Sequence, residues 1–192
     1  MTQHQQGRLR PPVSDDDHSA GPAGAPVTLV EYGDFQCPYC FRAHPVVMTL
    51  QERLGDKLRF VFRNFPIADL HPYAPKAAEA AESVAAHAGP EAYWRMHHAI
   101  FEHQQDSPDA LDRSHLFRYA AAAGADAARV QSDLEASAFA ARVNADFLSG
   151  VRSGVNGTPT FFINGVRFDG DWTSPSEFEA ALLEAASETA RT

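Results

Sequence analysis

Two cysteines separated by two residues are the feature of this sequence best suited to chemistry. Cys37 and Cys40 are the only cysteines among 192 residues. A disulfide between them closes a loop of only a few residues, so it removes little entropy from the unfolded chain and adds little stability. The pair therefore points to a reaction rather than to stabilisation of the fold.

The position of the pair indicates which reaction this is. Residues 27–32 form an apolar, β-rich run that ends at Gly33, and Pro38 suits the first turn of a helix. Backbone N–H groups at a helix N-terminus stabilise an anion and lower the pKa of a cysteine there. The thiolate is the nucleophile of thiol–disulfide exchange. We therefore expect Cys37 to be the exposed attacking sulfur, and Cys40 to be more buried and to resolve the mixed disulfide.

A zinc site and a pair of buried structural thiols are the alternatives for these cysteines. Structural zinc needs four ligands, and the chain has no second Cys-X-X-Cys motif. Nine histidines offer other donors, but His97 and His103 are out of phase on a helix. We expect His97 to pack beside Trp94 and Phe101 instead. The sequence favours exchange chemistry and predicts no metal site.

The elements that must position the pair predict an α/β fold. After the first strand, apolar residues recur at helical spacing up to residue 54, and residues 58–63 read as a second strand. We expect these strands to be parallel and joined by a right-handed crossover. From about residue 70 to 153 the chain is alanine-rich and strand-poor, which predicts an inserted helical subdomain with helices over residues 72–88, 91–104, 112–123 and 126–152.

The chain then returns to β structure. Residues 160–163 and 166–168 flank Asn164-Gly165, the preferred pair for a two-residue type I′ hairpin. Residues 174–177, Ser-Pro-Ser-Glu, have the pattern of a capping box before a closing helix. The whole order predicts a central mixed β-sheet of about four strands flanked by helices.

Residues 1–25 are polar and interrupted by proline and glycine, so we expect a disordered leader before a domain over residues 26–192. This leader lacks the apolar segment of a secretory signal, which favours the cytoplasm; removal of an upstream signal would instead indicate the periplasm or another extracytoplasmic compartment. The formal net charge of −9 argues against a nucleic-acid partner. No apolar run has the length of a membrane-spanning helix.

Two separated motifs resemble one known family. Residues 28–40, Thr-Leu-Val-Glu-Tyr-Gly-Asp-Phe-Gln-Cys-Pro-Tyr-Cys, and residues 157–165, Gly-Thr-Pro-Thr-Phe-Phe-Ile-Asn-Gly, resemble the DsbA-like thiol–disulfide oxidoreductases of the thioredoxin superfamily. The resemblance extends over about residues 26–190 and includes the helical insertion. Residues 62–66, 71–72 and 94–97 are similar to bacterial members of the soluble, sometimes antiporter-fused, type. The resemblance implies a thioredoxin fold and an enzyme whose redox group is the disulfide of the chain itself, with no other cofactor.

The resemblance also implies roles for individual residues. Thr158-Pro159 is expected to be a cis bond that faces the cysteines, in a loop that binds the substrate chain and keeps metal away; the alternative is a trans proline at the start of an edge strand. Pro38 and Tyr39 are assigned to substrate binding as well. Aromatic residues near the motif, Phe35 among them, offer either an apolar platform for unfolded polypeptide or ordinary core packing.

Glu31 is an acid in an otherwise apolar strand, six residues before Cys37. It matches the buried acid that assists proton transfer at the second cysteine in this superfamily. We expect burial to raise the pKa of Glu31, which suits a group that exchanges protons with Cys40. The alternative is an outward-facing residue at a strand end.

The dipeptide between the cysteines, Pro38-Tyr39, lacks the histidine of strongly oxidising DsbA proteins and matches that of glutaredoxins. Without a cation at position 39 the thiolate is less stabilised, which predicts an intermediate potential. The function indicated is disulfide exchange with thiol- or disulfide-containing polypeptides, recycled by a redox partner or glutathione. A glutathione- or thioredoxin-coupled reductase, a disulfide isomerase and a non-catalytic thioredoxin-fold binding module remain alternatives.

Overall fold

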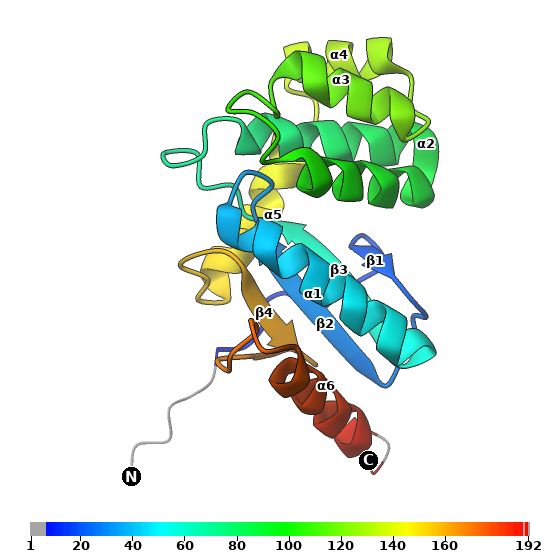
Figure 1. Ribbon diagram of the computed structural model, residues 1–192, viewed down its shortest axis with the longest axis vertical. Helices are drawn as coiled ribbons and strands as arrows, with labels where there is room; N and C mark the ends of the chain where they lie inside the picture. The colour runs from blue at the N-terminus through cyan, green and yellow to red at the C-terminus, as the bar shows by residue number, and fades with distance from the viewer. Residues whose placement is uncertain (1–6, 190, 192) are drawn as a thin grey trace. The chain divides into compact units, whose positions relative to one another are not determined.

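The structure is a computed structural model that describes residues 7–189 and 191 (Figure 1). The chain divides into two compact units, which we describe separately. The sheet unit contains the described residues up to Gly33, together with Arg42–Arg63 and the residues from Leu148 onward. The helical unit contains Asp34–Phe41 and Asn64–Phe147.

A five-stranded mixed sheet forms the centre of the sheet unit. Its order is β1-β3-β2-β4-β5, and β2 pairs antiparallel with β4, as β4 does with β5. All four residues of β4 and all but one of β2 are buried, as expected for inner strands. The strands are β1 (His18–Ala20), β2 (Val27–Gly33), β3 (Leu58–Asn64), β4 (Thr160–Ile163) and β5 (Val166–Arg167).

Two helices begin at the prolines that the sequence places in a first helical turn. Helix α1 spans Pro38–Leu54, and α6 spans Pro175–Thr189. Only half of the predicted capping box is present, because the Glu177 N–H lies 3.4 Å from Ser174 Oγ while the Glu177 carboxylate accepts from Asp171 N. The predicted hairpin between β4 and β5 is confirmed. Asn164 and Gly165 have φ values of 47° and 78°, as a type I′ turn requires.

The prediction of a disordered leader is wrong for residues 7–25, while residues 1–6 lie outside the described part of the chain. Leu9 is buried, and its N–H donates to Gly165 O. Strand β1 pairs antiparallel with β3, with His18 opposite Phe62, and supplies the fifth strand of the sheet. These partners are far away in the sequence, so the polar composition of the segment does not reveal them.

Helices make up most of the helical unit, which confirms the predicted insertion (Figure 1). They are α2 (Ala74–His103), α3 (Arg113–Ala122), α4 (Ala127–Ala136) and α5 (Ala140–Arg152), whose last turns belong to the sheet unit. Gly89, with φ 83°, interrupts α2 where the sequence predicts a break. The predicted single helix over 126–152 is wrong, because Ser137 has φ 51° and ends α4. Within the described residues, no helix is long and apolar enough to cross a membrane.

Candidate active site

The two cysteines lie at the beginning of α1. Cys37 directly precedes the helix, its carbonyl accepts from Phe41 N, and Cys40 follows one turn later. Both are present as thiols. Cys37 is 3% exposed and Cys40 is fully buried, so the prediction of an exposed Cys37 is wrong. The side chain between them is accessible, since Tyr39 is 56% exposed.

Asp34 contacts both cysteines through its backbone. Its carbonyl accepts from Cys37 N at 3.1 Å, and its N–H donates to Cys40 Sγ at 3.4 Å. The carboxylate is buried and accepts three hydrogen bonds: from Gln36 N to Oδ1 at 2.7 Å, and from Ile67 N and His71 Nδ1 to Oδ2, each at 2.8 Å. The turn before the cysteines is therefore held by one buried acid.

Two glutamines add further hydrogen bonds to this turn. Gln36 Oε1 accepts from Tyr73 N at 2.7 Å. Gln104, buried at the end of α2, donates from Nε2 to Phe35 O at 2.7 Å and to Cys37 O at 3.3 Å. Tyr73 and Gln104, both distant in the sequence, thus add hydrogen bonds to the turn that contains Cys37.

The aromatic residues before the pair belong to the core. Phe35 is 1% exposed, and its ring centroid lies 5.2 Å from Phe101 and 5.5 Å from His97. His97 packs edge-on against Trp94 at 5.1 Å and Phe101 at 5.0 Å, which confirms the predicted contacts. Of the two interpretations of Phe35, core packing is the correct one.

The remaining predicted residues belong to the sheet unit. Glu31 lies in β2, is 3% exposed and stands opposite Phe161 of β4, so it is not an outward-facing acid at a strand end. The Thr158–Pro159 bond is cis, as the resemblance implies, and directly precedes β4. Glu31 thus lies in one strand, and Pro159 directly before the strand that pairs with it. Their roles in the reaction stay predictions.

Sequence reasoning did not assign roles to Asp34, Gln36, His71 and Gln104. Asp34 had one usable signal, because an acid at the end of a buried strand needs partners. His71 entered only through the family resemblance. Gln104 lies 67 residues after Cys37, and no local pattern connects the two.

Comparisons with known proteins agree with this geometry. A sequence model described as thioredoxin matches residues 14–184. Among curated relatives, the Na(+)/H(+) antiporter NhaA 1 of Mycolicibacterium vanbaalenii is 40% identical over 179 residues, and NhaA of Herminiimonas arsenicoxydans is 41% identical over 185. The matches cover 92% and 96% of this chain but only 28% of each antiporter, so the chain spans little more than a quarter of these relatives.

Solved structures show the same fold. BdbD of Bacillus subtilis superposes with a TM-score of 0.83 at 23% identity, and the match covers 95% of this chain and 97% of BdbD. A thioredoxin-like oxidoreductase from Silicibacter pomeroyi gives a TM-score of 0.72 at 26% identity, covering 93% and 95%. The predicted thioredoxin fold with a helical insertion is confirmed. The chain therefore belongs to the thioredoxin family, has a DsbA-like fold, and carries its Cys-X-X-Cys pair at the start of α1.

Proposed function

We propose that the chain is a thiol–disulfide oxidoreductase that exchanges disulfides with polypeptide substrates through Cys37 and Cys40. The observation that carries this proposal is the placement of two cysteine thiols one turn apart at a helix N-terminus, with a backbone donor on the second sulfur. A helix N-terminus lowers the pKa of a thiol, and a lowered pKa makes a thiol both a nucleophile and a good leaving group.

The oxidation half-reaction follows from this arrangement. A substrate thiolate attacks the Cys37 sulfur of the oxidised pair, the bond to Cys40 breaks, and Cys40 leaves as a thiolate that accepts the Asp34 N–H. A second substrate thiolate then attacks the substrate sulfur of the mixed disulfide, and Cys37 leaves as a thiolate. The substrate gains a disulfide and the cysteine pair gains two electrons. Two thiolates enter and two thiolates leave, so these steps release no net proton.

Five further residues are assigned to this reaction. Glu31 exchanges the proton of Cys40, and its burial in β2 supports that role. Pro38 and Tyr39 contact the substrate, since both are exposed directly beside Cys37. Thr158 and Pro159 bind the substrate backbone, a role carried by the family resemblance.

The strength and direction of the reaction depend on position 39. Tyr39 places no cation beside the Cys37 thiolate, which supports an intermediate potential rather than a strongly oxidising one. A redox partner or glutathione returns the pair to its working state. When the recycling partner instead delivers electrons to the cysteine pair, the same pair reduces substrate disulfides.

Equilibration in glutathione buffers with thiol trapping tests the proposal. We expect the protein to pass between dithiol and disulfide forms at a defined ratio of reduced to oxidised glutathione. The enzyme claim fails when no intramolecular disulfide forms at any ratio. Cys40→Ala should accumulate mixed disulfides with substrate polypeptides, whereas Cys37→Ser should not. Unchanged partner binding and cellular effect in Cys37→Ser would indicate a binding module instead.

A further inference from the structure

Asp34 is held in the cysteine turn through both its backbone and its side chain. Its carboxylate is buried, and three donors share its two oxygens. Rotation of this side chain would break all three hydrogen bonds at once. The peptide of Asp34, which supplies the N–H to Cys40 Sγ, is therefore held in one orientation.

His71 is the one side chain among the three donors, since the other two are the backbone N–H groups of Gln36 and Ile67. The His71 side chain is 16% exposed, and its Nδ1 lies 2.8 Å from Asp34 Oδ2. Residues 67–73 are also connected to the turn through Ile67 N on Asp34 and Tyr73 N on Gln36. A substitution at His71 can consequently loosen Asp34 while the two backbone donors stay in place.

We propose that Asp34 and His71 form a positioning pair that holds the Asp34 N–H on the Cys40 sulfur and thereby shifts the dithiol–disulfide equilibrium toward the dithiol. The proposal rests on the function proposed above and adds to it a determinant of the redox equilibrium. Neither side chain is assigned a chemical step. The sulfur of Cys40 reacts, the Asp34 N–H stabilises it, and His71 acts through Asp34.

The direction of the effect follows from charge. A hydrogen bond to an anion is stronger than one to a neutral acceptor, so the Asp34 N–H stabilises a Cys40 thiolate more than a disulfide sulfur. The relevant equilibrium converts the protein disulfide and two molecules of glutathione into the protein dithiol and one glutathione disulfide. A donor that favours the thiolate raises the constant of this equilibrium and makes the protein disulfide more oxidising.

A second histidine–aspartate pair in the helical unit provides a matched control. His87 Nε2 lies 2.8 Å from Asp133 Oδ2, the same separation as in the His71–Asp34 pair, with side chains 29% and 22% exposed. Asp133 accepts from Ser83 and His87, which both lie in α2 and outside the cysteine turn. Removal of His87 thus tests the loss of an imidazole–carboxylate contact without loosening Asp34.

The first measurement is the glutathione equilibrium constant of four proteins: the unchanged chain, His71→Ala, His71→Asn and His87→Ala. We expect His71→Ala to lower the constant about threefold to tenfold, the worth of one hydrogen bond. His71→Asn retains a donor near the position of Nδ1 and should recover most of the loss. His87→Ala should stay within about twofold. An unchanged constant in His71→Ala, or an equal fall in His87→Ala, overturns the proposal.

The second measurement separates this proposal from the oxidoreductase function. In a Cys37→Ser background only Cys40 ionises as a thiol, and its thiolate is followed by ultraviolet absorbance. His71→Ala should lower the ionisation constant of Cys40 about threefold to tenfold. If His71→Ala does not fold, Asp34→Asn is measured in its place and should lower the same constant. If the unchanged chain forms no disulfide, the proposed function fails and this titration still tests the pair. If Cys40 has the same ionisation constant with and without His71→Ala, the Asp34–His71 pair does not stabilise the Cys40 thiolate and the proposal is overturned.

Discussion

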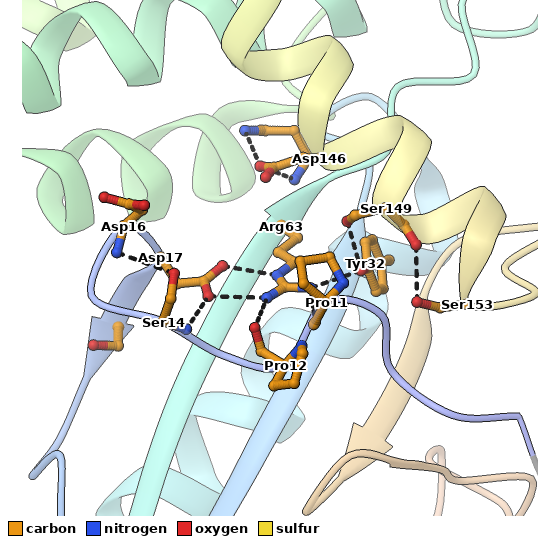
Figure 2. Close-up of polar contacts among 12 residues, drawn as sticks. Pro11, Pro12, Ser14, Asp16, Asp17, Tyr32, Arg63, Asp146, Ser149 and Ser153 are labelled. Carbon is orange, nitrogen blue, oxygen red and sulfur yellow. Dashed lines mark hydrogen bonds and ion pairs between the residues drawn. The ribbon is translucent and has the colours of Figure 1, made fainter.

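Arg63 and Asp17 form a buried ion pair in the sheet unit, with Nε 2.7 Å from Oδ1 and Nη2 2.9 Å from Oδ2 (Figure 2). The guanidinium also donates to the carbonyls of Pro11 and Pro12 and to the Tyr32 hydroxyl. Its five N–H groups can all be satisfied by these five contacts. Burial opposes the charge, yet the hydrogen bonds to Asp17 and Tyr32 outweigh it and raise the pKa of Arg63 above its ordinary value.

Arg63→Met should be among the most destabilising substitutions in the chain. It removes the guanidinium from Asp17, whose side chain is only 6% exposed, and so breaks a buried ion pair. Breaking a buried ion pair in this way costs about 3–5 kcal/mol. The loss is measured as the free energy of unfolding in urea, together with faster proteolysis of the segment that contains Pro11 and Pro12.

The matched control for Arg63 is Arg53. Arg53 Nη1 lies 2.8 Å from Glu179 Oε2, but the two side chains are 55% and 24% exposed. An exposed pair contributes about 0–1 kcal/mol, so Arg53→Met should change the free energy of unfolding by no more than that. Equal losses in the two variants would show that burial does not control the strength of the Arg63 pair.

The sequence predicts the parts of the fold that depend on local chemistry. The strand before the cysteines, the helix start at Pro38, the break at Gly89 and the Asn164-Gly165 turn all depend on residues adjacent in the chain. Strand β1 was missed because its three residues acquire a strand conformation by pairing with β3, about forty residues later. The break at Ser137 was missed because serine rarely adopts φ 51°.

The same distinction applies to the candidate site. The cysteine pair is a local motif, and the sequence identifies it together with the helix that follows. Contacts that fix its backbone come from His71 and Gln104, which are far from the turn in the sequence and near it in the folded helical unit. The burial of Cys37 also depends on such distant residues, so reasoning from its place at a helix N-terminus predicted too much exposure.

Gln104→Met should destabilise the protein by about 1–3 kcal/mol, although methionine has a similar volume. The Nε2 group donates to Phe35 O and Cys37 O, and methionine would leave both buried carbonyls without this donor. Chemical unfolding monitors the change. Gln131→Met is the control, because Gln131 is exposed and bonds Glu135 on its own helix, and its effect should lie within about 0.5 kcal/mol.

Asp112 should stabilise the helical unit at neutral pH, and this contribution should decline as the solution becomes acidic. It is the N-cap of α3, and hydrogen bonds from His115 N, the His115 ring and Ser114 lower its pKa well below the ordinary value. Since the pKa in the folded state is the lower one, the stabilisation is present above pH of about 4 and is lost as the pH falls below that value. Thermal unfolding between pH 7 and pH 2 measures this decline.

Two substitutions at Asp112 separate capping from charge. Asp112→Ala removes the cap and should cost about 1 kcal/mol at pH 7. Asp112→Asn keeps an oxygen that can cap the helix, so it should retain most of the stability at pH 7 and show a smaller decline in acid. The same acid decline in Asp112→Asn and in the unchanged chain would contradict a role for the carboxylate charge.

Tyr39→His should make the disulfide more oxidising. Tyr39 is exposed in the first turn of α1, between the two cysteines, and a protonated imidazole there would stabilise the Cys37 thiolate of the reduced pair. A hydrogen bond to a charged group contributes about 1.5–3 kcal/mol, so the glutathione equilibrium constant should rise about tenfold or more at pH 6. The rise should shrink at pH 8, where histidine is neutral. Tyr39→Phe, which adds no cation, should stay within about twofold at both pH values, and an equal rise in Tyr39→Phe would exclude the electrostatic explanation.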